Sequence, residues 1–151
     1  MIDCVDYLQI LHITAEITEN LRKIADCVVP LIDNQLPRSI MNVIVQISTG
    51  IKKLYNNSIQ SLLTKDILLA NNILDMSLNV TNLWNLCLKA NDKSQISCLA
   101  LANIRVAIDC LEHIQQHTHE IANISIDRAE AVEARASTAH LAEKAKHPYL
   151  R

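Results

Sequence analysis

Three side chains that can bind a metal stand at helical spacing in the second half of the chain: His113, His117 and Glu120. Residues four and seven positions apart share one face of an α-helix, so two imidazoles and a carboxylate would point the same way. Such ligands suit Zn²⁺ or Ni²⁺. No fourth ligand is obvious, and no glutamate lies between the histidines to act as a base. The interpretation that we favour is a helix on which His117 partly faces the core while His113 and His119 are solvated.

Catalytic chemistry has less support than metal binding. The single Gly50 argues against the glycine-rich loops that cradle dinucleotides or phosphates. A Cys110 thiol beside His113 would come from the rigid middle of a helix, without the backbone donors of an oxyanion hole. The five cysteines form no CxxC pair and no zinc spacing, which indicates reduced structural thiols. We therefore expect a protein that is not an enzyme.

Composition predicts an all-α fold. Half of the 151 residues are hydrophobic, yet the chain has no Phe, one Gly and three Pro, whereas sheets and tight turns depend on aromatics, Gly and Pro. The net charge of −2 argues against a sequence-independent nucleic-acid binder. The sequence contains no run of eighteen apolar residues, so it predicts no membrane span. The acidic N-terminus is unlike that of a signal peptide. We expect a cytoplasmic protein.

Apolar residues three and four apart predict four long helices joined by short connections. Their expected ranges are about 2–32, from after Pro37 to about 63, about 65–89, and from Ser94 to about 126. Short connections are typical of antiparallel neighbours, so the helices should form an elongated antiparallel up-down bundle. The pattern assigns to the buried side of the first helix Ile2, Val5, Leu8, Leu11, Ala15, Leu21, Ile24, Val28 and Leu31. On the fourth helix it assigns Ile96, Leu99, Val106, Cys110, Ile114, Ile121 and Ile124.

The segment Leu111-Glu112-His113-Ile114-Gln115-Gln116-His117, preceded by Arg105, resembles the signature of the PhoU family. Asp66, Asp75 and Trp84 follow the order of acids and apolar residues in another helix of the family unit. The resemblance implies a PhoU-like three-helix unit over residues 37–126. Residues 1–33 then resemble the last helix of a preceding unit, and residues 127–151 form an alanine-rich, charged helical extension or tail.

The resemblance also implies where a metal would bind. In metal-binding members of the family, clusters of acids four residues apart converge from neighbouring helices. Here each pair is half lost, since Glu112 is followed by Gln116, Asp75 by Asn79, and Asp26 is preceded by Arg22. A neutral amide weakens cation binding, and an arginine competes with it. The candidate ligands for Zn, Fe or Ni are Glu112, His113, His117, Asp75 and Asp26.

By resemblance, the function is that of a non-enzymatic regulator that couples phosphate status to transport or signalling. It would act through protein–protein docking to a membrane transporter or a signalling kinase on the cytoplasmic face, and we expect it to form a homo-oligomer. Two alternatives stay open. One is a metal-binding helical bundle, and the other is an accessory or oligomerisation domain of another ion transporter, such as a potassium channel.

Overall fold

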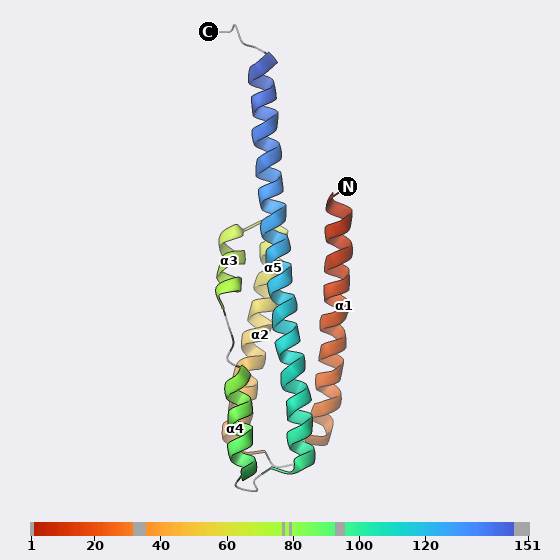
Figure 1. Ribbon diagram of the computed structural model, residues 1–151, viewed down its shortest axis with the longest axis vertical. Coiled ribbons are helices and arrows are strands. Elements are labelled where there is room, and N and C mark those ends of the chain that lie inside the picture. Colours follow the sequence, from red (N-terminus) through yellow and green to blue (C-terminus); the bar gives the residue numbers. More distant parts are fainter. Residues whose placement is uncertain (1, 32–35, 77, 79, 93–95, 147–151) are drawn as a thin grey trace.

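The chain folds as an all-α structure, as its composition predicts (Figure 1). The computed structural model describes residues 2–31, 36–76, 78, 80–92 and 96–146, and the side chains of 4–31, 36–76, 78, 82–92 and 96–138. Six helical elements make up this part of the chain: α1 (Ile2–Val28), the short 3₁₀ helix η1 (Val29–Leu31), α2 (Arg38–Thr64), α3 (Ile67–Asp75), α4 (Val80–Asp92) and α5 (Cys98–Lys146).

The helices form an antiparallel bundle organised around α5. In Figure 1, α1 runs down, α2 runs up, α3 and α4 run down, and α5 runs up again. Every other helix packs on α5. With 49 residues against 27 in α1 and in α2, α5 spans roughly 74 Å against roughly 40 Å at 1.5 Å rise per residue. Its C-terminal part therefore projects beyond the other helices.

The third predicted helix, about 65–89, is wrong as a single element, because the chain breaks between α3 and α4. Met76 is extended, with φ −82° and ψ 116°, and its N–H bonds to the Ile73 carbonyl at 3.1 Å. The sequence there contains Ser77 and Asn79, whose side chains compete for backbone hydrogen bonds and favour turns over helix interiors. The Met76 carbonyl meets the His119 ring of α5, with 3.2 Å between Nε2 and the oxygen.

Local signals mark the helix ends that the structure describes. Lys65 ends α2 in the left-handed conformation, with φ 57° and ψ 37°. The Asp66 carboxylate then accepts a bond from the Leu69 N–H at 2.9 Å and caps α3, in the segment where a cap is predicted. At α5 the Ser97 hydroxyl accepts from the Ala100 N–H at 3.1 Å. The predicted cap Ser94, and residues 32–35 of the first break, lie outside the described residues.

Small side chains let α2 and α5 run close together in the upper half of the bundle. Thr118, Ala122 and Ser125 of α5 are wholly buried, as are Ser58 and Ser61 of α2. The larger aliphatic residues that fill the rest of the core include Ile13, Ile40, Leu54, Ile73, Leu83, Ile104, Ile108 and Ile121. These two parallel helices thus form the centre of the molecule.

The predicted buried side of α1 is wrong over most of the helix, although Ile24 packs on the core and Leu31 of η1 is buried, as predicted. Val5, Leu8, Leu11 and Leu21 are exposed, whereas Ile13, Ile17 and Cys27 are buried against α5. The helix carries two apolar stripes and packs on α5 and η1 alone, so only one stripe is covered. The prediction for the fourth helix is confirmed at the buried Ile96, Cys110, Ile114, Ile121 and Ile124. It is wrong at Leu99 and Val106, which are exposed, whereas Ala100, Ile104 and Ile108 are buried there.

The charged extension continues the last helix, which is one of the two arrangements that the sequence allows. α5 passes without a break through the expected boundary at residue 127 and ends at Lys146. Side chains 132–138 are all exposed. None of the helices in the described part of the chain combines the length and apolar character needed to cross a membrane.

Candidate functional site

The bundle is open along one edge, between α1 and α2. Among the described residues, α1 packs on α5 and η1, and α2 packs on α3, α4 and α5, but α1 and α2 do not pack on each other. An apolar groove of about 350 Å³ lies between them over α5. Its lining comes from Thr14, Ile17, Thr18, Leu21 and Ile24 of α1, from Ser48, Ile51, Lys52 and Tyr55 of α2, and from Leu111 and Ile114 of α5.

The groove has the chemistry of a site for apolar side chains. Its floor is formed by the buried Leu111 and Ile114, and Lys52 is the one charged residue in its lining. A groove of this kind between two helices accepts the apolar face of a third helix. Five polar side chains also line the groove, namely Thr14, Thr18, Ser48, Lys52 and Tyr55.

A second apolar stripe of α1 borders the groove. Its positions are separated by alternating steps of four and three residues, which is the spacing of a helix seam that packs on another helix. We call it the α1 seam; it consists of Tyr7, Leu11, Thr14, Thr18, Leu21, Ala25 and Val28. None of these residues is charged, and Tyr7, Leu11, Leu21 and Val28 are 56%, 66%, 54% and 45% exposed.

A network of ion pairs on α1 lies beside the seam. Arg22 donates to both carboxylate oxygens of Glu19, at 2.8 and 2.9 Å, and to Asp26 at 2.7 Å. The hydrogen bond to Glu19 raises the pKa of Arg22, and the bond from Arg22 lowers the pKa of Glu19. These groups are well exposed, so the network adds little to stability. It does hold the guanidinium among acids of its own helix.

The predicted metal ligands lie on three different helices. Asp26 is paired with Arg22 on α1, and Asp75 is exposed at the end of α3. On α5, Glu112 is partly buried, His113 is exposed, and His117 Nδ1 lies 3.2 Å from Glu120 Oε2. Within the described residues, no group of three or more His, Cys, Asp or Glu side chains is arranged to hold a metal ion. The structure thus brings together His117 and Glu120, and the metal site stays a prediction.

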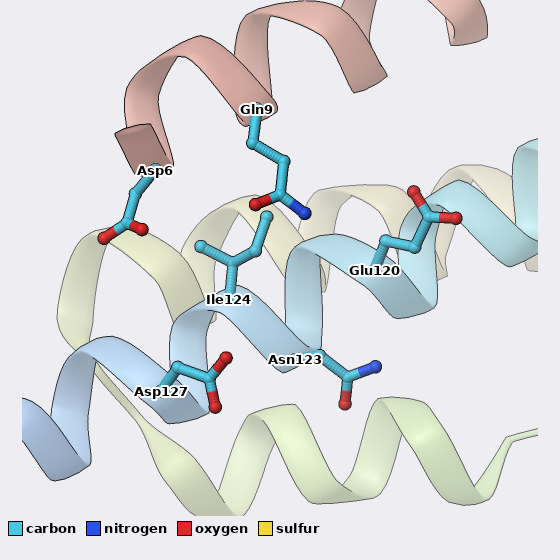
Figure 2. Close-up of a pocket in the computed structure, with 6 residues that line it drawn as sticks. All are labelled: Asp6, Gln9, Glu120, Asn123, Ile124 and Asp127. Carbon is cyan, nitrogen blue, oxygen red and sulfur yellow. The ribbon is translucent and has the colours of Figure 1, made fainter. Parts of the chain in front are cut away.

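A polar recess that the sequence did not predict lies between the N-terminal part of α1 and α5 (Figure 2). Its volume is about 190 Å³, and Asp6, Gln9, Glu120, Asn123 and Asp127 surround Ile124. In Figure 2 the three carboxylates lie on different sides of the recess and do not turn toward one point. The acids Glu120 and Asp127 are seven residues apart, which is the spacing that could have indicated a shared face.

Arg128 supplies positive charge close to this recess. Its Nε lies 4.0 Å from Asp6 Oδ2, and its guanidinium carbon lies 5.1 Å from the centre of the Tyr7 ring. Both contacts join α5 to the first two turns of α1. At 4.0 Å the Arg128 contact is too long to be a hydrogen bond, and Asp6 Oδ2 is buried without a hydrogen-bond partner among the described residues.

All five cysteines are free thiols. Cys27, Cys87 and Cys110 are buried, and burial raises the pKa of each thiol above its usual value of 9.0. These groups are therefore protonated at neutral pH and weakly nucleophilic, as structural cysteines are. Cys4 and Cys98 are exposed.

Comparison with known family models, with curated proteins and with solved structures finds no match for this chain. The expected relation to the PhoU family therefore rests on the residues quoted for it.

Proposed function

We propose that this chain is a PhoU-like regulatory protein that works by docking rather than by catalysis. The observation that supports the proposal is the open edge of the bundle, where the groove and the α1 seam expose apolar surface next to each other. Monomeric soluble proteins rarely leave large contiguous apolar patches uncovered, and those that do commonly use them as interaction sites.

The partner presents an amphipathic helix in this proposal. Aliphatic side chains three and four residues apart on that helix would enter the groove over Ile114, and the rest of its apolar face would lie on Leu11 and Leu21. By the resemblance, the partner belongs to a membrane transporter or a signalling kinase on the cytoplasmic face. Docking would carry phosphate status to it.

A deletion strain tests the proposal. Loss of the protein should change phosphate uptake or the expression of genes that respond to phosphate starvation, and the wild-type chain should restore both. The double variant Leu11→Glu/Leu21→Glu should fail to restore them. It places two carboxylates on the apolar edge, and burying these charges against an apolar partner costs free energy. Leu68→Glu is the matched control, since Leu68 is 72% exposed on α3, away from the edge.

Two results would overturn the proposal. One is a deletion strain whose uptake and gene expression match the parent at high and low phosphate. The other is full restoration by Leu11→Glu/Leu21→Glu at the expression level of the wild type. Circular dichroism of the purified variants checks that each is helical, as expected for substitutions of exposed residues.

A further inference from the structure

From Tyr7 to Ala25 the α1 seam is symmetric in spacing about the middle of its helix, and its four central positions also match in residue type, whereas Val28 has no counterpart in the seam. Reversing the chain direction about position 16 exchanges Tyr7 with Ala25, Leu11 with Leu21, and Thr14 with Thr18. A seam that maps onto itself in this way can pack against a second copy of itself related by a two-fold axis, with the helices antiparallel. Each layer of the contact would then contain one side chain from each half of the seam.

We propose that the protein forms a two-fold dimer in which the α1 seams of two copies pack antiparallel. This rests on the proposed function in one respect, because it names a second copy as an occupant of the same open edge. The Leu11 and Leu21 side chains of one copy meet Leu21 and Leu11 of the other. Thr14 and Thr18 form the two central layers.

The side chains that flank the seam agree with this geometry. Ala15 lies next to the two-fold axis, where its counterpart would be close, and its small side chain allows the helices to approach. Arg22 is held by Glu19 and Asp26 of its own helix, at 2.7 to 2.9 Å. No pair of like charges is therefore placed across the central layers. The opposite flank, with Ile10, Ile17 and Ile24, is already packed on α5 and the core.

The exposed area is of the size that a dimer needs. A Leu or Val side chain that leaves water removes on the order of 100 Å² of apolar surface. Four large seam residues that are about half exposed, together with Leu8 at 67%, supply several hundred Å² per copy. The threonines, Ala15, Ala25 and the Arg22 stem add to this along roughly 40 Å of helix. A standard interface buries about 800 Å² per partner.

The mass in solution is the first test. By light scattering on the eluting full-length protein at about 100 µM, the wild type should have twice the chain mass of 16.9 kDa, as expected for any dimer with a Kd below about 10 µM. Leu11→Glu/Leu21→Glu should have half the mass of the wild type, and Leu68→Glu should stay dimeric. A monomeric wild type, or a dimeric double variant, would overturn the proposal.

Cross-linking tests the antiparallel geometry, in a chain that carries Cys4→Ser and Cys98→Ser to remove the exposed thiols. Ala15→Cys should give a covalent dimer with a short bismaleimide, because the two thiols lie beside the axis. Ala25→Cys should not, since its two copies would be roughly 27 Å apart along the helices at 1.5 Å rise per residue. A covalent dimer from Ala25→Cys would overturn the antiparallel arrangement.

These measurements separate the dimer from the proposed function. A monomeric wild type whose double variant still fails in the deletion strain would refute the dimer and leave the regulatory docking in place. A dimeric wild type, together with a deletion strain that shows no phosphate phenotype, would support the dimer and refute the proposed regulatory function.

Discussion

Leu78 occupies the space that a side chain at Gly50 would need. A Cβ placed on Gly50 would lie 2.8 Å from Leu78 Cδ2 and 3.1 Å from Leu78 Cδ1. The one glycine of the chain thus stands in the middle of α2, where the Leu78 side chain lies against it. The φ angle of Gly50 is not positive, so its backbone conformation does not require glycine. The close approach of Leu78 is the reason for a residue without a side chain here.

Gly50→Ala should therefore give different results in two backgrounds. Alanine gains up to about 1 kcal/mol over glycine in a helix interior, but here it pushes the end of Leu78 away. We expect little net change in the wild type and a gain of about 1 kcal/mol in a Leu78→Ala chain, measured by urea unfolding. Thr49→Ala, on the exposed side of α2, is the control and should act alike in both backgrounds. Equal effects of Gly50→Ala in both backgrounds would refute the contact.

Ser125→Ala should stabilise the protein by about 1 kcal/mol. The Ser125 hydroxyl is fully buried and has no hydrogen-bond partner among the described residues. Its burial therefore carries a desolvation penalty that no hydrogen bond offsets, and the alanine variant lacks this penalty. Ser61→Ala is the matched control, because the Ser61 hydroxyl is equally buried and donates to the Ser58 carbonyl at 2.9 Å. Thermal or urea unfolding of both variants gives the comparison. A loss of stability in Ser125→Ala as large as in Ser61→Ala would contradict this prediction.

His119→Ala should loosen α3. The imidazole Nε2 lies 3.2 Å from the carbonyl of Met76, which follows the last residue of this nine-residue helix. Loss of one hydrogen bond of about 1 kcal/mol should raise amide exchange in α3 by about fivefold, in hydrogen–deuterium exchange read by mass spectrometry. His113→Ala, on the exposed side of α5, should leave α3 unchanged. Unchanged exchange in His119→Ala would show that the contact does not hold the helix.

The buried thiols predict a loss of stability at alkaline pH. Burial raises the pKa of Cys87 above 9.0, so the folded chain keeps this proton while the unfolded chain releases it. The stabilisation is fully present below about pH 9 and is lost as the pH rises through the pKa of the folded state. Cys87→Ala should therefore show a smaller fall in unfolding free energy from about pH 8 to 10.5. In the control variant Cys4→Ala, at an exposed position, the unfolding free energy should decrease with pH as it does in the wild type. An equal decrease in all three chains would contradict the role of the Cys87 thiol.

The sequence predicted the helices better than the faces that they bury. Apolar spacing and the scarcity of Gly and Pro suffice for an all-α bundle, and Asp66 marks a cap by its residue type. In α1, however, Leu11 and Leu21 belong to one apolar stripe and Ile13 and Ile17 to another. Periodicity alone does not show which of the two stripes packs on α5, because both have helical spacing and the choice depends on contacts with residues far away in the sequence.

The break between α3 and α4 depends on long-range contacts in the same way. Residues 65–89 carry helical spacing throughout, with no Pro or Gly to end it. The contacts that accompany the break, from Leu78 to Gly50 and from Met76 to His119, join residues 28 and 43 positions apart. The open edge was likewise beyond the sequence, since it follows from the lack of packing between α1 and α2.

The central claim is that the open edge of α1 and α2 is an interface, and photo-cross-linking in living cells tests it most directly. A photoreactive amino acid would replace Leu11 or Leu21 on the edge, with Leu68 on α3 as the control. We predict adducts from both edge positions whose peptides come from this chain, from a membrane transporter or from a signalling kinase, and none from Leu68. Edge positions that yield no adduct, while the protein is folded and expressed, would contradict the claim.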